Sequence, residues 1–548
     1  MKADDITLHG ILTPTNQYAI PVFQRYYSWE RKDWQKLWED LVELQEPEAN
    51  AQTHFMGSLV FVAEEHFPNK VPVFQVIDGQ QRLITMTLLL AALRNTAKAH
   101  GFDDLASEIS NTFLVHPYKS GREHMRVYPR QRDRDQYIGA IKGSESVDGR
   151  VGEALRFFEQ QILSLPSNSN GEGLHNLFGT LQARLQFVYI QLQNENPYQV
   201  FKSLNSTGVD LSEADLIRNF MFMHVKLEDQ DGFDDYHWKP LEKRFEDETG
   251  RLDVGALSAF FRDFLMSEGK YVPTSATFQQ FEQSYQGSSF QPTALAETLA
   301  HDAKLYDILR GRQKHPDLAV DAALEKLRRL DSSTAYPLVL NLMRRVENGK
   351  MTIADLRSAV ELLSGFVLRR YVVGESSRGY SRWFVSACTN LGDNPLAGLR
   401  SFLLSKGFPS DEVFTEALIQ YPLYKSYYTK TVLVSLERAK GHKEIVELAD
   451  VQVEHIMPQT LSGDWKADLG PNAELIHDRW LHTIGNLTLT GYNSELSNDT
   501  FSFKRKDYKN SNIEITRDLA DYEKWTETEI ETRGKALAAQ VASIWRGP

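Results

Sequence analysis

The chain has 548 residues, enough for two to four domains, and its 41% hydrophobic and 25% charged content is ordinary for a globular protein. Its formal net charge of −13 argues against indiscriminate DNA binding through bulk charge, so any contact with nucleic acid must come from local basic patches. A single cysteine, Cys388, excludes an intrachain disulfide; no signal-peptide segment and no apolar run near the roughly 20 residues that span a bilayer are seen, which predicts a cytoplasmic protein without a membrane anchor.

The first 115 residues or so predict an α+β arrangement. An aromatic-rich segment over 18–29 leads into a helix from Glu30 to about Leu44, and Ser28 is placed to cap that helix. Strands are predicted over 55–63 and 73–77, where β-branched and aromatic residues concentrate. The next segment changes to helical periodicity and predicts a helix over 80–94.

The turn between the second strand and this helix consists of Asp78, Gly79, Gln80, Gln81 and Arg82. Backbone N–H groups at a helix start favour anions, and the guanidinium of Arg82 adds a charged fork suited to phosphate. Asp78 can hold a metal ion or a ribose hydroxyl. Taken alone, the turn fits a plain strand–helix connection as well as it fits a nucleotide site.

The following segment, to about residue 230, is mixed. A solvated face is favoured over a DNA track for its arginine-rich part, which contains Arg122, Arg126, Arg130, Arg132 and Arg134. A strand is predicted over 187–192. Ser212 and Asp215 have the spacing of a capping box at a helix start.

Residues 231 to about 440 are predicted to be mostly helical. Apolar residues recur every three or four positions over 322–330, 335–346 and 352–371, as in helices that face a core. This region has no recognisable catalytic motif. A connecting role between the two ends of the chain is therefore expected.

The C-terminal region combines two short strands with a polar site. Alternation up to His455 predicts a strand that Pro458 ends, because proline has no N–H to give to a ladder. A second strand is predicted over 486–490, and Asn493 follows at the expected start of a helix. The predicted order is strand, long loop, strand, helix.

The side chains around these strands are those that phosphodiester cleavage needs. A neutral imidazole takes a proton from water, which makes His455 the candidate base. Glu454 and Asn493 offer oxygen ligands suited to Mg²⁺ or Mn²⁺, and Asn486 is placed to orient the imidazole. The alternative is a buried polar pair in an ordinary hairpin, which the combined spacing disfavours.

Cations follow the second strand. Lys504, Arg505 and Lys506 are interleaved with aromatic residues, a pattern compatible with phosphate contact and equally with a solvated helix end. The tail over 525–545 predicts an amphipathic helix that packs on the same domain.

At the C-terminal residues the chain resembles the HNH (ββα-metal) nucleases, and most closely the branch with Glu-His-Ile-x-Pro, Gly-Asn-Leu-x-Leu and a later Asn. The resemblance implies that His455 is the general base, that Asn486 orients it, and that Glu454 and Asn493 bind the metal. Asn493 stands where many HNH enzymes have histidine. Further positions that fit the branch are Pro458, Gln459, His482 and Lys504.

At the N-terminal end the set Ile20-Pro21-x-Phe23-Gln24-Arg25-x-Tyr27-x-Trp29, His54-Phe55-Met56-Gly57-Ser58-Leu59 and Asp78-Gly79-Gln80-Gln81-Arg82 resembles the GmrSD-type, modification-dependent (type IV) restriction systems. Phosphorothioate-sensing relatives such as SspE share this domain.

The resemblance implies a ParB/sulfiredoxin-like fold that binds and hydrolyses a nucleoside triphosphate at the Asp-Gly-Gln-Gln-Arg motif, with Gln24 and Arg25 as neighbours. Ile84 replaces a threonine of the usual motif and removes one hydroxyl. The resemblance extends to residues that would close the pocket, namely Asn205, Gly208, Asp215, Arg218 and Asn219. For each of them taken singly, helix capping or a buried ion pair explains the residue equally well.

Three domains are predicted: a GmrS-like nucleotide-binding and sensor domain over 1–230, a helical connection over 231–440 and an HNH nuclease domain over 441–548. The resemblance implies a nucleotide-dependent endonuclease that cuts modified, double-stranded phage DNA. A homodimer would supply the two HNH sites that cutting both strands needs. Two alternatives stay open: a nucleotide hydrolase whose HNH domain only binds DNA, and a non-enzymatic, nucleotide-responsive DNA-binding protein.

Overall fold

The computed structural model describes residues 2–22, 24, 26–46, 52–64, 70–129, 133–144, 146–165, 171–192, 211–226, 229–287, 290–441, 448, 450–491 and 498–548. The chain forms two compact units. Unit 1 comprises Met1–Val254 and Phe281–Glu297, and unit 2 comprises Gly255–Gln280 and Thr298–Pro548. The predicted α+β class is confirmed. The domain boundaries predicted at 230 and 440 stay predictions.

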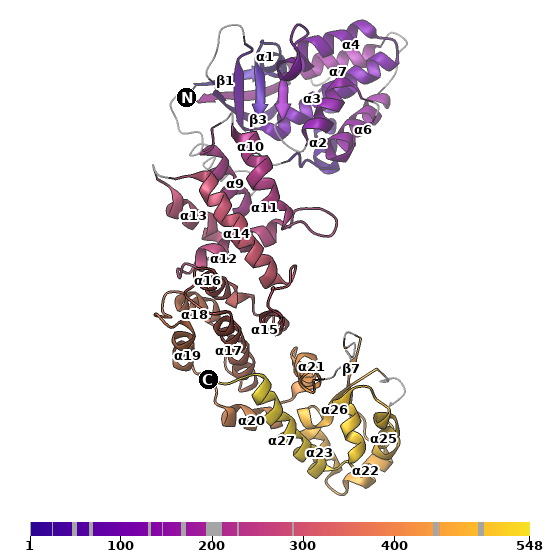
Figure 1. Ribbon diagram of the computed structural model, residues 1–548. Coiled ribbons are helices and arrows are strands. Elements are labelled where there is room, and N and C mark those ends of the chain that lie inside the picture. Colours follow the sequence, from indigo (N-terminus) through magenta and orange to yellow (C-terminus); the bar gives the residue numbers. More distant parts are fainter. Residues whose placement is uncertain are drawn as a thin grey trace. The chain divides into compact units, whose positions relative to one another are not determined.

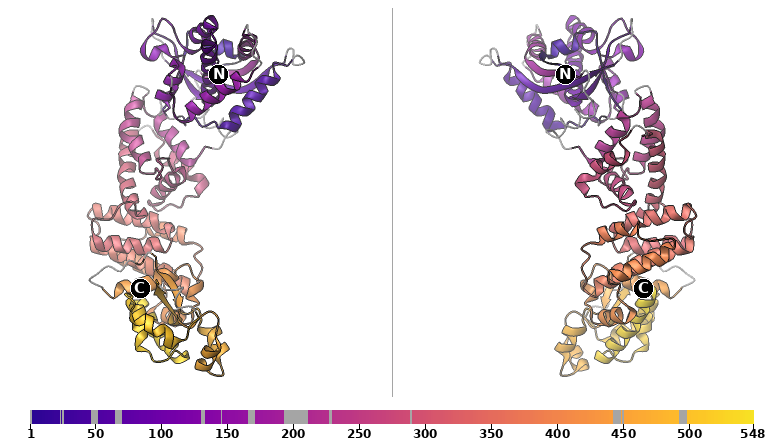
Figure 2. Two further views of the ribbon diagram at one scale, coloured as in Figure 1. Left: turned by 90° about the vertical axis from the view of Figure 1, so that its right-hand side faces the viewer. Right: turned by 90° about the vertical axis from the view of Figure 1, so that its left-hand side faces the viewer.

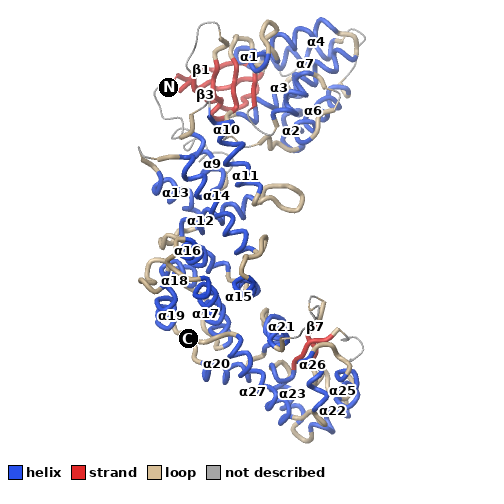
Figure 3. Tube along the Cα trace, in the orientation of Figure 1, coloured by secondary structure: helices blue, strands red, loops and turns tan. Residues whose placement is uncertain are grey.

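A six-stranded mixed sheet forms the centre of unit 1 (Figures 1 and 3). Its order is β1-β6-β3-β4-β2-β5; the pairs β1–β6 and β3–β4 are antiparallel and the other three are parallel. The strands are β1 Lys2–Thr7, β2 Gln17–Ile20, β3 His54–Ala63, β4 Val73–Asp78, β5 Val127–Pro129 and β6 Leu185–Leu192.

Helices pack beside this sheet, and α3 lies at the centre of them (Figure 1). Most of its side chains are buried, which explains why it is apolar on all sides rather than along one stripe. The helices of this unit are α1 Leu8–Leu12, α2 Arg31–Glu43, α3 Gln80–Ala99, α4 Asp103–Ile109, α5 Arg134–Lys142, α6 Gly149–Leu163, α7 Glu172–Ala183, α9 Glu213–Met223, α10 Gln230–Phe233, the π-helical turn η5 Asp234–Trp238 and α11 Lys239–Lys243.

The predicted strands β3, β4 and β6 and the helices α2, α3 and α9 are confirmed, with ends that move by a few residues. The predicted cap of α2 is wrong. Glu30 occupies the N-cap and forms a capping box with Asp33, whereas the backbone N–H of Ser28 donates to Gln81 Oε1. The predicted box of Ser212 and Asp215 at the start of α9 is confirmed. Strands β1, β2 and β5 were not predicted.

From residue 254 the chain is helical for almost 200 residues, as predicted; Figure 2 gives two further views. The helices are α12 Val254–Met266, α13 Thr277–Tyr285, α14 Pro292–Arg310, α15 Leu318–Arg329, α16 Tyr336–Glu347, α17 Ile353–Val372, α18 Tyr380–Ala387, α19 Pro395–Ser405, α20 Asp411–Gln420 and α21 Thr429–Ala439. Among the described residues, no helix combines the length and the apolar character needed to cross a membrane.

The end of unit 2 contains a two-stranded antiparallel sheet, β7 with β8, and a cluster of short helices around it (Figure 3). Trp465, Trp480 and Trp525 form the middle of its small core. The elements are β7 Gln452–His455, α22 Gly463–Leu469, α23 Ala473–Trp480, the 3-10 turn η9 Ile484–Asn486, β8 Leu487–Thr490, α25 Phe501–Lys509, α26 Glu514–Arg517 and α27 Glu527–Ile544. Both predicted strands and the predicted C-terminal helix are confirmed.

Candidate active site and nucleotide site

Glu454 and His455 are the last two residues of β7, paired in the antiparallel register with Thr488 and Leu487 of β8. Both residues are buried, each with 5% of its surface exposed. Alternation within a strand would send neighbouring side chains to opposite faces. The carboxylate of Glu454 and the imidazole of His455 therefore lie on opposite faces of β7 and contact different side chains.

The imidazole of His455 lies just beneath the surface, surrounded by polar and aromatic groups. Its Nε2 is 3.2 Å from Nδ1 of His482, and its Nδ1 is 3.4 Å from Nε2 of Gln459. The ring of Tyr424 packs against it with centroids 4.1 Å apart, and the same tyrosine stacks on His482 at 5.5 Å and 10°. His482 and Gln459 fitted the HNH pattern in the sequence, and both contact the candidate base.

Burial, together with smaller effects of the nearby His482, Lys504 and His477, lowers the pKa of His455 to about 3. The imidazole is therefore neutral at ordinary pH, which is the form that can accept a proton. Burial also lowers the pKa of His482, with Lys425 and His477 as smaller causes. The contact between His455 and His482 is thus one between two uncharged rings.

Asn486 is fully buried and holds the chain that follows β7. Its Oδ1 accepts from the backbone N–H of Met457 at 2.8 Å and from Nε1 of Trp525 at 3.1 Å. Its Nδ2 donates to the carbonyls of Met457 and Leu481, both at 3.0 Å. The side chain thus fixes the backbone two residues after His455. An orienting effect of Asn486 on the imidazole itself stays a prediction.

Glu454 is held by an ion pair with Lys504, which α25 places beneath β7. The ammonium of Lys504 lies 2.6 Å from Glu454 Oε1 and also donates to the carbonyls of His455 and Ile456. The hydroxyl of Tyr508 is 3.5 Å from the same carboxylate oxygen. Burial raises the pKa of Glu454 and lowers the pKa of Lys504, while their mutual attraction opposes both shifts.

These contacts bear on the expected divalent cation. Carboxylate and amide oxygens are the hard ligands that Mg²⁺ and Mn²⁺ prefer, so the donor chemistry of Glu454 and Asn493 fits. Glu454 Oε1 already has a cationic partner, and Asn493 lies outside the described residues. The part of the chain that the structure describes contains no group of three or more His, Cys, Asp or Glu side chains arranged to hold a metal.

The three cations expected to contact DNA differ in position. Lys504 is buried and committed to Glu454, which does not favour a contact with a phosphate. Arg505 is half-buried and donates from Nε to the carbonyl of Ala520 at 2.8 Å. Lys506 is exposed, with its ammonium 5.9 Å from the ring centroid of Phe503. Of the three, Lys506 has the position that suits a backbone phosphate.

In unit 1 the strand–helix turn has the predicted form. Asp78 ends β4, Gly79 has φ +89° at the N-cap, and α3 begins at Gln80. A Cβ on Gly79 would lie 2.3 Å from Leu59 Cδ2 and 2.9 Å from the carbonyl oxygen of Ser58. Close approach to β3 and the left-handed backbone therefore both require glycine.

Asp78 and Arg82 face each other across this turn. Nη1 of Arg82 lies 3.7 Å from Oδ2 of Asp78 and donates to the carbonyl of Ser58 at 2.6 Å. A Cβ on Gly57, whose φ is +100°, would lie 3.1 Å from the guanidinium carbon. Both charged side chains are about a third exposed, with values of 28% and 30%. They are accessible to a ligand at the start of a long helix.

The glutamines of the motif are buried and bind the neighbouring loop. Gln81 accepts from the N–H of Ser28 at 2.8 Å and donates to the carbonyl of Tyr26 at 3.1 Å. Gln24 donates to the carbonyls of Ile77 and Val76 at 2.8 and 3.3 Å, at the end of β4. Gln80 is buried as well, and Arg25 lies outside the described residues. These contacts tie the segment around Gln24 to the strand–helix turn.

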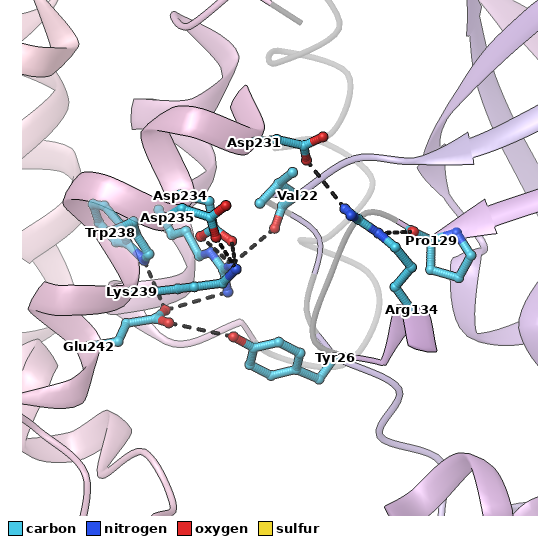
Figure 4. A network of polar contacts seen from close by, with 11 residues as sticks. Val22, Tyr26, Pro129, Arg134, Asp231, Asp234, Asp235, Trp238, Lys239 and Glu242 are labelled. Atoms are coloured by element: carbon cyan, nitrogen blue, oxygen red, sulfur yellow. Dashed lines mark hydrogen bonds and ion pairs between the residues drawn. The ribbon is translucent and has the colours of Figure 1, made fainter. Parts of the chain in front are cut away.

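Arg218 of α9 fastens the other side of this loop, and Figure 4 labels its partners Val22, Asp234 and Glu242. Its Nη2 donates to the carbonyl of Val22 at 3.0 Å, and its guanidinium lies over the ring of Tyr26. Ion pairs join it to Asp234 at 3.6 Å and Glu242 at 3.4 Å. Burial opposes the positive charge, but Glu242, Tyr26 and Asp234 outweigh this effect and raise the pKa of Arg218.

Of the other residues expected to close the pocket, Asp215 caps α9, Asn219 is buried, and Asn205 and Gly208 lie outside the described residues.

Comparison with known families matches both ends of the chain. The model of the GmrSD restriction endonuclease N-terminal domain covers residues 8–222, which include the turn at Asp78 and the loop at Gln24. The model of the GmrSD restriction endonuclease C-terminal domain covers residues 408–540, which include both strands at His455. The chain belongs to the GmrSD restriction endonuclease family.

A curated relative of this GmrSD chain is an uncharacterized protein of Methanocaldococcus jannaschii. The two are 26% identical over 248 residues, a match that covers 39% of the chain and 40% of the relative's length. The matched part thus spans less than half of that relative.

Sequence reasoning missed Tyr424, which contacts both histidines of the candidate site. It comes from the 3-10 turn Leu423–Lys425 before α21, and its backbone N–H donates to the carbonyl of His482 at 3.1 Å. The GmrSD C-terminal domain begins at 408 and includes it, whereas the predicted nuclease domain began at 441. A tyrosine 31 positions before His455 gives no local signal.

Proposed function

We propose that this protein is a nucleotide-dependent type IV endonuclease that cuts modified, double-stranded DNA in the cytoplasm as a defence against phage. The position of the buried His455 imidazole, in contact with His482, Gln459 and Tyr424, is the observation that carries the proposed cutting reaction. His455 lies at the end of the first strand of a ββα arrangement, β7, β8 and α25, which is the order of an HNH site. The membership of the GmrSD family supports the same proposal.

The contacts of His455 suggest how its proton is handled. If the amide of Gln459 donates to Nδ1, that nitrogen carries a lone pair and Nε2 carries the hydrogen, which points to Nδ1 of His482. In this tautomer the attacking water displaces the Gln459 amide from the single lone pair of Nδ1, which then takes the proton of the water. His482 then stabilises the imidazolium by accepting from Nε2, and Tyr424 limits rotation of both rings.

A divalent cation, Mg²⁺ or Mn²⁺ held by Glu454 and Asn493, would supply stabilisation of the negative charge on the phosphate and leaving oxygen. Glu454 must then share its carboxylate between this cation and Lys504. Burial raises the pKa of this carboxyl, and the charge and hydrogen bond of Lys504 oppose that shift and favour the ionised form that can act as a ligand.

For unit 1 we propose a nucleoside triphosphate site at the Asp78–Arg82 turn. Arg82 and the backbone start of α3 suit the phosphates, and Asp78 suits a metal ion or a ribose hydroxyl. Gln24 and Gln81 hold the adjoining loop in place. A homodimer is also part of the proposal, because nicking both strands of a duplex requires two HNH sites.

Plasmid nicking tests the cutting reaction. The full chain is incubated with Mg²⁺ or Mn²⁺ and matched unmodified, glucosylated and phosphorothioated DNAs, with each nucleotide added in turn. His455→Ala is expected to abolish nicking while DNA binding and the melting temperature stay near those of the native protein. His301→Ala, which alters an exposed histidine paired with Glu347, is the control. Nicking by His455→Ala at the native rate would refute the role of His455.

A second function is favoured by one observation. Lys504 occupies an oxygen of Glu454, and a domain whose carboxylate is permanently paired would bind DNA without cutting it. The protein would then be a nucleotide hydrolase. Phosphate release without nicking on any of the three DNAs would favour this second function, whereas loss of phosphate release in Asp78→Ala and Arg82→Ala is expected under both.

A further inference from the structure

A pocket of about 320 Å³ lies within unit 2, away from both sites described above. Its walls come from α15, α17, α21, the last turn of α27 and the residues that follow α27. Five cationic and two acidic side chains line it, an excess of three positive charges in a protein whose net charge is −13. The charged lining residues are Glu325, Lys326, Arg329, Arg357, Glu361, Arg438 and Arg546.

The two carboxylates are each shared between two arginines. Glu325 accepts from Arg329 at 2.7 Å and from Arg438 at 3.2 Å. Glu361 similarly accepts from Arg357 at 2.9 Å and lies 3.6 Å from Arg546. Each bridge thus keeps one positive charge in excess and holds two guanidinium forks at the rim. The arginines are substantially exposed, so the bridges themselves add little stability.

Lys326 lies between these bridges and has no carboxylate of its own. Among the described residues none places a carboxylate within 4.0 Å of its ammonium, which lies 3.5 Å from the carbonyl of Ile544 and 5.8 Å from the ring centroid of Trp545. Burial lowers the pKa of Lys326; Glu361 opposes this shift, and Arg357 adds to it. A half-buried ammonium in a cationic pocket is the group that a bound anion would stabilise.

We propose that this pocket binds a small phosphorylated anion. Guanidinium forks and a lysine ammonium are the groups that proteins use for phosphate, and the pocket holds both. The buried Trp545, with Val434 and Ile544, adds an apolar wall for an organic part of the ligand. The volume lies at the lower end of the range of roughly 300–1,000 Å³ for small-molecule sites, which suits a mononucleotide or a terminal phosphate and excludes a duplex.

The inference is independent of the proposed nuclease reaction, because it uses none of the residues of the His455 or Asp78 sites. The phosphate can come from a free phosphorylated compound or from the 5′ end of a nucleic acid. The competing interpretation is that the charged residues of the pocket are ordinary solvated surface cations. Such cations would show no preference for phosphate over chloride at equal ionic strength, whereas a phosphate site at Lys326 would.

Residue-specific acetylation of lysines in the full chain tests the proposal. Peptide mass spectrometry reports the acetylation rate of Lys326 and that of Lys350, an exposed lysine of the same unit that does not line the pocket. Pyrophosphate is expected to protect Lys326 saturably and to leave Lys350 unchanged. Sodium chloride at matched ionic strength is expected to protect neither. Equal protection by both salts, or protection of both lysines alike, would overturn the proposal.

A variant pair and a second probe sharpen the test. Arg357→Gln is expected to weaken the protection at least about tenfold, as loss of a charged hydrogen bond does, whereas Arg400→Gln, an exposed arginine outside the pocket, leaves it unchanged. Equal effects of the two variants would overturn the proposal.

The second probe identifies the source of the phosphate. Protection by 5′-phosphorylated tetrathymidylate but not by its unphosphorylated form assigns the phosphate to a nucleic-acid end, and protection by pyrophosphate alone assigns it to a free anion.

Discussion

The ammonium of Lys504 and the carboxylate of Glu454 form an ion pair of 2.6 Å in which both side chains are buried. The lysine comes from α25 and the glutamate from β7, so the pair fastens the helix beneath the strand that carries His455. The ammonium of Lys504 also donates to the backbone carbonyls of the two residues that follow Glu454. The contact therefore fixes the end of the strand at the candidate base.

Lys504→Met is expected to destabilise the C-terminal part of unit 2. Removing one partner of a buried pair leaves the other charge unpaired, which costs about 3–5 kcal/mol. Urea unfolding of the full chain measures the loss. Lys506→Met is the matched control, because Lys506 lies in the same helix with an exposed side chain, and a change within about 0.5 kcal/mol is expected.

The same two variants separate a structural role from a DNA contact. A lysine that binds phosphate would lower DNA affinity and reduce its salt dependence when it is replaced, with little effect on unfolding. If Lys504→Met behaved in that way and unfolded like the native protein, the ion pair would not hold the strand. For Lys506→Met, a reduced salt dependence is the expected result.

The short-range features of this protein were predictable from its sequence. The ends of β7 follow from alternation and Pro458, the turn at Gly79 follows from its motif, and the capping box of α9 follows from its spacing. Each depends on residues within a few positions of one another, where hydrogen bonding and backbone preferences decide the outcome. The candidate residues His455 and His482 were found through their motif.

The partners of these residues were not predictable in the same way. Lys504 was expected to face DNA, and its burial depends on how α25 packs on β7, 50 positions earlier. Tyr424 reaches His455 from outside the predicted domain. The three missed strands of unit 1 are short or lie at the sheet's ends, where pairing with distant strands determines whether a strand forms.

Asn486→Ala is expected to destabilise the protein. The substitution removes the partners of the Met457 N–H and the Trp525 indole N–H, both of which are buried, and each unsatisfied group costs about 1–3 kcal/mol. Thermal unfolding and nicking are measured together. We expect the melting temperature to fall along with activity, so lost activity alone does not identify a catalytic residue. A variant that melts like the native protein but does not cut would instead support direct action on His455.

Gly79→Ala is expected to cost more stability than Gly101→Ala. Both glycines have positive φ, +89° and +80°, where an L side chain costs roughly 1–2 kcal/mol. A Cβ at Gly79 also meets Leu59 and Ser58 at under 3.0 Å, whereas nothing lies within 4 Å of one at Gly101. The difference in unfolding free energy between the two variants therefore measures the close approach of the turn to β3. Equal losses would mean that β3 moves aside without cost.

Arg218→Met is expected to loosen the loop around Tyr26. The substitution leaves Glu242 buried without its arginine and leaves Asp234 with its second ion pair, to Lys239, at a cost of about 3–5 kcal/mol. Arg134→Met is the control, since its ion pair with Asp231 is exposed and worth at most about 1 kcal/mol. Hydrogen exchange of the Tyr26 and Ser28 amides is the measurement, and we expect faster exchange in Arg218→Met alone. Unchanged exchange would show that Gln81 suffices to hold the loop.

The stability of unit 2 is expected to depend on pH through Asp263. Burial raises the pKa of this carboxyl from 3.8 to about 7, although the hydroxyl of Tyr306 donates to it at 2.8 Å. Between pH about 4 and 7 the folded protein therefore holds a proton that the unfolded chain has released. Stability is fully present below that window and falls as the pH rises through it, by up to about 1.4 kcal/mol for each unit.

Asp263→Asn removes the ionisation and keeps an oxygen that accepts from Tyr306. Urea midpoints at pH 5 and pH 8 are compared for the native protein, for Asp263→Asn and for Asp393→Asn, which alters an exposed aspartate of the same unit. Other groups titrate in this range, so the difference between variant and native protein is the quantity that isolates Asp263. We expect the gain in stability of Asp263→Asn over the native protein to be larger at pH 8 than at pH 5, because the native protein loses stability as the pH rises through that interval. The same gain at both values would mean that the benefit comes from packing instead of ionisation.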